Sequence, residues 1–202
     1  RSRHHGPRMA SGAVMSNETL WYLCRATGLA SVVLLTLVVV LGIVTSGRRR
    51  PFGERATIVM GLHRWLSLGM VAFLATHIVT AIVETYVSID WISLVVPFTS
   101  AYAPLWVGLG TLAFDLLVAV LATSYWRHRM TERAWKAVHW LSYLMWPLAI
   151  IHGIALGTAN QPLLRAATIC CGAVGAGALA WRLTTSYADR DRRRDVLAGG
   201  WS

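Results

Sequence analysis

The stretch that decides the fold is GLHRWLSLGMVAFLATH, residues 61–77, an apolar run with one histidine near each end. A second stretch, VHWLSYLMWPLAIIH at residues 138–152, has the same design. A helix needs about 20 mostly apolar residues to cross the hydrocarbon core of a membrane, and both stretches lie within runs of that length. Each therefore predicts a membrane-spanning helix that carries two histidines.

The rest of the chain has the composition of a membrane protein. Hydrophobic residues make up 55% of its 202 residues and charged residues only 14%, with a mean hydropathy of +0.52; soluble domains carry about 25% charged residues. This composition excludes a soluble enzyme, a disordered chain and a disulfide scaffold. Segments long enough to span lie at about 20–46, 58–86, 104–125, 135–157 and 163–183. We expect an all-α integral membrane protein, a bundle of five transmembrane helices over 20–183, between an N-terminal tail (1–19) and a basic tail (184–202).

The distribution of charge predicts the orientation. Lys and Arg exceed Asp and Glu, 19 against 9, and cluster after the first span, after the third and in the C-terminal tail. The stretch 88–103 holds Asp90 and no Lys or Arg. The positive-inside rule then places the basic loops and the C-terminus in the cytoplasm and the N-terminus outside a plasma membrane. We do not expect nucleic-acid binding, and we expect part of residues 1–14 not to be native protein.

The four histidines inside the spans carry the chemistry. His63 and His77 are fourteen residues apart, and His139 and His152 thirteen. At 1.5 Å per residue the two levels lie about 20 Å apart, too far for one metal ion. The spacing suits two stacked haems, each with two axial imidazoles: His63 with His139 on the inner side, and His77 with His152 on the outer side. The alternative is that these histidines are interior residues that donate to backbone carbonyls.

Two details refine the haem hypothesis. Thirteen residues leave His152 about 140° from the direction of His139 in an ideal helix, and we expect a distortion at Trp146–Pro147 to restore the facing. The cysteines, residues 24, 170 and 171, form no C-x-x-C-H motif. Covalent haem attachment is therefore excluded, and the cysteines are expected to be small apolar filler.

The paired histidines, in the contexts GLHRWLSL and AWKAVHWLSY, resemble the ferric reductase-like transmembrane domain. This domain forms the membrane part of NADPH oxidases, of ferric-chelate reductases and of the haem subunit for methionine sulfoxide repair. The likeness covers residues 20–185 and is greatest to the stand-alone actinobacterial branch. It implies two non-covalent b haems that pass electrons across the membrane, with His63, His77, His139 and His152 as iron ligands.

The chain departs from the larger family members. They usually have six spans and a C-terminal flavin and nicotinamide domain, whereas 19 residues follow the last predicted span here and no G-x-G-x-x-G loop is found. We therefore expect no FAD or NADPH site in this chain. It is expected to be the membrane haem subunit of an oxidoreductase and to need a separate dehydrogenase.

The electron donor is expected to be a cytoplasmic flavoprotein or quinol. The acceptor at the outer face is left open among oxygen, a ferric chelate, a quinone and a redox protein. The alternatives are a quinone-linked cytochrome b subunit of a larger complex and a non-catalytic subunit that only holds haem.

Polar residues near the histidines suggest further roles. Arg64 and Lys136 are candidates to contact the propionates of the inner haem, and Arg25 and Arg165 those of the outer haem; the alternative for each is interfacial snorkelling.

Two carboxylates, Asp115 and Glu84, either relay protons or complete a hydrogen-bond network. The apolar stretch SIDWISLVVPFTSAYAPLW, residues 88–106, is predicted to form a lid over His77 and His152.

Overall fold

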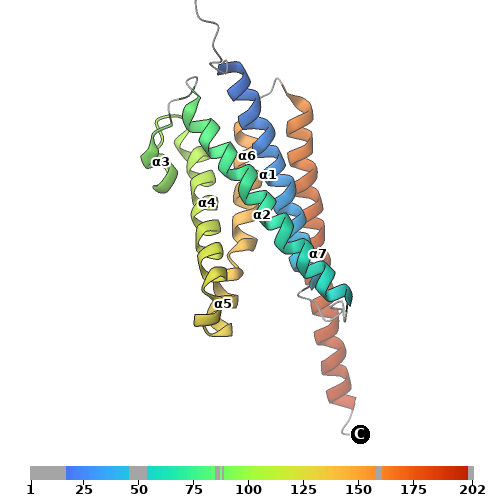
Figure 1. Cartoon of the computed structure of the whole chain (residues 1–202). Coiled ribbons are helices and arrows are strands. Elements are labelled where there is room, and N and C mark those ends of the chain that lie inside the picture. Colours follow the sequence, from blue (N-terminus) through green and yellow to red (C-terminus); the bar gives the residue numbers. More distant parts are fainter. Residues whose placement is uncertain (1–16, 46–53, 85–86, 88, 158–160, 200–202) are drawn as a thin grey trace, which may run out of the picture.

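The computed structural model describes residues 17–45, 54–84, 87, 89–157 and 161–199, with the side chains of 185–199 left aside (Figure 1). The elements in chain order are α1 (Asn17–Thr45), α2 (Glu54–Val83), α3 (Trp91–Val95), α4 (Pro104–Tyr125), the 3-10 turn η1 (Arg127–Arg129), α5 (Glu132–His139), α6 (Ser142–Leu156) and α7 (Pro162–Gly199). The described part contains no strand. The predicted N-terminal tail lies almost entirely outside the described residues.

Five helices are long and apolar enough to cross a membrane, which confirms the predicted number of spans. They are α1, α2, α4, the combined segment Glu132–Leu156, and the first part of α7 as far as Thr184. The fold is therefore an all-helical multi-pass membrane protein. The span within α7 ends at Thr184, next to the predicted residue 183, and the helix itself continues to Gly199.

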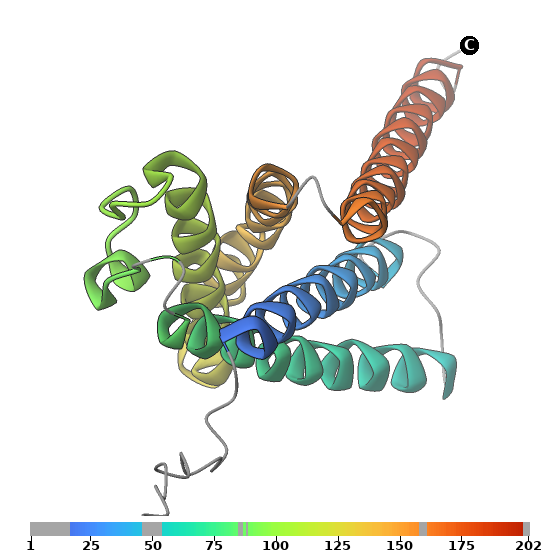
Figure 2. The same ribbon diagram turned by 90° about the horizontal axis from the view of Figure 1, so that it is seen from above.

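The helices form two groups that face each other across the bundle (Figures 1 and 2). α2 crosses α1, α4 packs along α6, and α1 connects the groups through its contacts with α6 and α7. The core where they meet contains Leu35 and Ile43 of α1, Met70 of α2, Leu117 of α4 and Trp146 of α6. This arrangement sets the histidine-bearing helices α2 and α6 opposite each other.

Hydroxyl groups in α1 are satisfied within the helix. Thr27 Oγ1 donates to the Leu23 carbonyl at 2.7 Å, and Ser31 Oγ donates to the Thr27 carbonyl at 2.8 Å. Such bonds to the preceding turn let a helix carry small polar residues through hydrocarbon, where an unpaired hydroxyl is costly. Polar residues in α1 are thus compatible with a span.

The helix that carries the second histidine pair is broken, but not where the sequence suggested. α5 ends at His139 and α6 begins at Ser142, whereas α6 runs on through Pro147. At the break, Leu141 N donates to the Val138 carbonyl at 2.9 Å, and Ser142 Oγ donates to the His139 carbonyl at 2.7 Å. Tighter turns of this kind change the helical phase. The interruption one to two turns before the proline therefore accommodates the thirteen-residue spacing.

The prediction of a lid over the outer histidines is wrong. α3 and the segment after it, 96–103, pack on the face of α4 that points away from the bundle (Figure 2). Thr111 Oγ1 donates to the Ser93 carbonyl at 2.6 Å, and Phe98 covers Gly108, which has no side chain to obstruct it. The apolar side chains of α3 point outward, with Trp91 72% exposed. The stretch therefore packs along α4 and does not cover the outer histidines.

Candidate functional site

The structure brings the four helical histidines together as two facing pairs. The ring centroids of His63 and His139 are 6.4 Å apart, and those of His77 and His152 are 6.5 Å apart. Each pair joins α2 to the broken α5–α6 segment. The two pairs are those expected from co-oriented helices.

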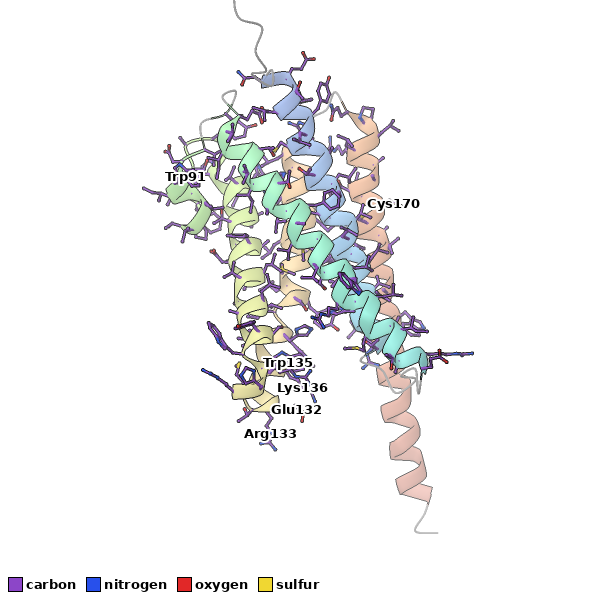
Figure 3. All side chains as sticks on the ribbon, in the orientation of Figure 1. Trp91, Glu132, Arg133, Trp135, Lys136 and Cys170 are labelled. Atoms are coloured by element: carbon purple, nitrogen blue, oxygen red, sulfur yellow. The ribbon has the colours of Figure 1, made fainter. Side chains whose placement is uncertain are left out.

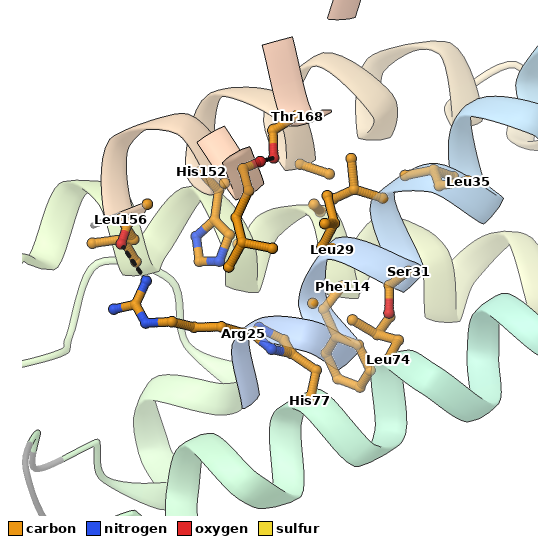
Figure 4. A pocket seen from close by; sticks show the side chains of 18 of the residues that line it. Arg25, Leu29, Ser31, Leu35, Leu74, His77, Phe114, His152, Leu156 and Thr168 are labelled. Atoms are coloured by element: carbon orange, nitrogen blue, oxygen red, sulfur yellow. Dashed lines mark hydrogen bonds between the residues drawn. The ribbon is translucent and has the colours of Figure 1, made fainter. Parts of the chain in front are cut away.

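The outer pair lies across a cavity lined by five helices, α1, α2, α4, α6 and α7. His77 and His152 point toward each other, with Leu74 and Phe114 on the inner side and Arg25 at the mouth (Figure 4). The walls are apolar apart from the histidines and a few polar side chains near the outer end. The cavity is therefore a slot suited to a flat, largely apolar group.

Backbone carbonyls fix the outer imidazoles. His77 Nδ1 lies 2.8 Å from the Cys24 carbonyl oxygen, and His152 Nδ1 lies 2.8 Å from that of Trp106. A carbonyl only accepts, so Nδ1 of each ring carries the proton and donates it. In a neutral imidazole this leaves Nε2 with a free lone pair, the state that a metal ligand requires.

Two glycines leave the space that the outer imidazole rings occupy. A Cβ on Gly28 would come within 2.8 Å of His77 Nδ1, and one on Gly110 within 2.5 Å of His152 Cε1. Any larger residue would displace the rings, since carbon atoms in contact stay about 3.5–4.0 Å apart. The imidazoles therefore lie directly against the backbones of α1 and α4.

In the inner pair, His63 also packs against a glycine of α1, but at a larger distance. His63 faces Val38 and Gly42 of α1, fourteen residues after Cys24 and Gly28, as the antiparallel register requires. A Cβ on Gly42 would lie 3.9 Å from the His63 ring, an ordinary contact. Nδ1 of His63 makes no well-aligned hydrogen bond.

His139 has an aromatic neighbour instead of a carbonyl. The Trp135 indole stacks on its ring with centroids 5.0 Å apart and planes 24° apart, and the Arg127 guanidinium lies 4.3 Å from the centre of that indole. The inner pair is thus linked by a continuous stack to the basic end of the bundle.

Unpaired polar atoms gather around the histidines. Six buried side-chain atoms within the described residues have no hydrogen-bond partner. Three belong to the inner site: Nδ1 of His63, Nδ1 of His139 and Nε1 of Trp135. The others lie at the outer end: Arg25 Nε, Gln161 Oε1 and Glu84 Oε1. Buried polar atoms are normally paired, so these atoms remain available to partners other than the described side chains.

The candidate propionate contacts differ in their surroundings. Arg25 and Arg165 line the outer cavity, and Arg25 donates to the Leu156 carbonyl at 3.3 Å. Arg64 is exposed on α2, and Lys136 forms an ion pair with Glu132 on the surface of α5. The outer cations therefore share a cavity with their histidine pair, whereas the inner ones are open to the surroundings.

The two carboxylates also lie in different settings. Glu84, just beyond the end of α2, is buried, and this burial raises the pKa of its carboxyl while the nearby Arg25 lowers it. Asp115 is half-buried on α4, on the side that carries Thr111 and faces away from the cavity. Only Glu84 is therefore close to the outer histidine pair.

Sequence reasoning missed several residues that shape the sites. Gly28 and Gly42 are fourteen apart, the same interval as His63 and His77, and this match was a readable signal. No motif in the sequence marked Trp135 as a neighbour of His139, and nothing in the sequence marked Gln161. Within the described ranges, no three or more His, Cys, Asp or Glu side chains are grouped so that they could hold a metal ion. The helical histidines are grouped only in pairs.

Comparison with known proteins identifies the family. No curated protein and no solved structure matched the chain. The family described as Ferric reductase like transmembrane component matches residues 27–150, more than half of the chain. The matched region contains His63, His77 and His139 and ends two residues before His152. The chain belongs to the ferric reductase-like transmembrane component family.

Proposed function

We propose that this protein carries electrons across the plasma membrane through two b haems, one held by His63 and His139 and the other by His77 and His152. The spacing of the histidines carries the proposal. Two imidazoles on opposite sides of one metal, each bonded at about 2 Å, have ring centres about 6 Å apart. The observed separations of 6.4 and 6.5 Å fit that requirement at both levels.

Other observations support the same cofactor. Haem is flat and apolar with an anionic edge. The outer cavity offers apolar walls, two imidazoles and, near its mouth, the cations Arg25 and Arg165. The unpaired Nε of Arg25 can then donate to the anionic edge, and Oε1 of Gln161 can accept from ordered water beside it. Arg64, Lys136 and the unpaired Trp135 Nε1 are the corresponding candidates at the inner site.

The residues of the chain would hold and insulate the cofactors. When bound, haem supplies iron that takes up and releases one electron at a time. Cys24 and Trp106 hold the outer imidazoles in one tautomer through their carbonyls, and the apolar core between the two levels excludes water. Electrons would enter at the basic, cytoplasmic end from a flavoprotein or quinol and leave at the outer end to an external acceptor.

The test is a count of haem in the purified chain. Pyridine haemochrome analysis of detergent-solubilised protein should give two protohaems per chain, and the absorbance spectrum of the intact protein should be low-spin and six-coordinate. His63→Ala and His77→Ala should each remove one. One haem per wild-type chain, no haem, or loss of the same haem in both variants would contradict the proposal.

A further inference from the structure

The structure has a basic surface directly beside the inner histidine pair. It is formed by η1 and α5 and carries the exposed cations Arg127, Arg129, Arg133 and Lys136 against one carboxylate, Glu132. Figure 3 shows Arg133, Trp135 and Lys136 gathered at one end of the bundle. We call these residues, 127–136, the basic platform.

The platform is built as a definite structure. Thr131 caps α5 by accepting from the Ala134 amide at 3.3 Å, and α5 packs against α4. The Lys136–Glu132 pair spans one turn of the helix. These contacts hold Trp135 between the surface and His139, so the orientation of its ring is fixed by the fold.

A stack of planar groups joins this surface to the inner site. Arg127 lies over Trp135 at 4.3 Å, Trp135 stacks on His139 at 5.0 Å, and His139 faces His63 at 6.4 Å. The positive-inside rule explains basic residues at this end of a bundle, but it does not explain an indole stacked on a histidine. Within the described residues, neither outer histidine has a stacked indole.

We propose that the basic platform is the docking surface for the electron donor, a separate protein with an acidic face and a one-electron redox centre, and that Trp135 provides the contact through which the electron reaches the inner site. The proposal rests on the proposed function. In each encounter the carrier loses one electron and the inner site gains one, and no bond is made or broken. Charge complementarity identifies the partner, because a cationic surface attracts and orients an anionic one and raises the rate of encounter.

The test compares two reductants on the full, haem-loaded chain in a neutral detergent. Photoreduced flavodoxin is an acidic protein with one flavin, and reduced riboflavin is small and carries at most one negative charge. Stopped-flow absorbance should show that the flavodoxin rate falls about tenfold as ionic strength rises from low to high. The riboflavin rate should hardly change.

Charge-reversal variants locate the surface. Arg133→Glu should slow flavodoxin about tenfold at low salt and leave riboflavin unchanged. Arg55→Glu is the matched control, since it makes the same change in net charge at the start of α2, away from α5 (Figure 1), and should slow flavodoxin less than twofold. Trp135→Leu should slow both reductants several-fold per bound haem, whereas Trp135→Phe keeps a stacked ring and should slow them less than Trp135→Leu does.

The outcomes separate this inference from the function on which it rests. A wild-type chain without haem overturns the proposed function and the docking surface with it. A haem-loaded chain whose flavodoxin rate is independent of salt, or equally affected by Arg133→Glu and Arg55→Glu, overturns the docking surface alone. Equal rates for the Trp135→Leu and Trp135→Phe variants overturn the role of the indole.

Discussion

Gly110→Ala tests whether the close approach of His152 to α4 builds the outer site. The new Cβ would lie 2.5 Å from His152 Cε1, 2.6 Å from Nδ1 and 3.1 Å from Cγ. Carbon contacts need about 3.5–4.0 Å, so the ring must move by about 1 Å. That movement breaks the 2.8 Å hydrogen bond to the Trp106 carbonyl and changes the 6.5 Å spacing to His77.

The expected effect is a loss of the outer haem despite a gain in helix propensity. Alanine should stabilise a helix by about 1 kcal/mol relative to glycine. Overpacking costs about 1–3 kcal/mol, and the lost hydrogen bond about 1 kcal/mol more. The haem content should fall from two per chain toward one, measured by pyridine haemochrome on protein that elutes as a single species in size-exclusion chromatography.

Gly42→Ala is the matched control on the inner site. Its Cβ would lie 3.9 Å from His63 Cε1, a normal contact, so this variant should keep both haems. The reasoning is refuted if Gly110→Ala retains two haems with unchanged spectra, or if Gly42→Ala loses as much haem as Gly110→Ala.

Three further changes probe the core, the outer carboxylate and the ligands. Gly175→Ala should lower the free energy of unfolding by about 1–3 kcal/mol, because its Cβ overlaps the buried Trp146 indole. Gly177→Ala is the control and should not lower it, because the space around Gly177 is open. Equal shifts in thermal midpoint for the two variants would contradict the prediction. Glu84→Gln should raise the thermal midpoint near pH 8 but not near pH 4. Burial raises the pKa of the Glu84 carboxyl in the folded protein. The folded protein is therefore stabilised by the bound proton at low pH and loses this stabilisation as the pH rises through that pKa. A midpoint difference that is the same at both pH values would argue against a buried carboxyl. His77→Ala should leave one haem that cytoplasmic-side reductants still reduce while reduction of an impermeant external acceptor falls to background, and continued external reduction would exclude a two-haem path.

The spans were predictable because hydrocarbon imposes a simple length requirement on apolar segments. Each of the five predicted segments overlaps a helix that is long enough to span, and α4 has the predicted bounds. The predictions that were wrong concern places where a segment could make either of two sets of local contacts. The apolar stretch predicted as a lid, 88–106, had two possible neighbours, the outer histidines or the outer face of α4. The absence of a side chain at Gly108 leaves room for Phe98 on α4. The break after His139 uses side-chain and 3-10 bonds that a proline-based argument did not consider.

By itself, the sequence determined a five-span helical membrane protein, the basic end of the bundle and four intramembrane histidines at two levels, because these follow from composition and from the fixed rise of a helix. Only the tertiary structure decided which surfaces touch the imidazoles: the Cys24 and Trp106 carbonyls and two glycines at the outer pair, and a stacked indole at the inner pair. The physical reason is that hydrogen bonding and close packing depend on the register and crossing of helices far apart in the chain, which no local pattern of residues specifies.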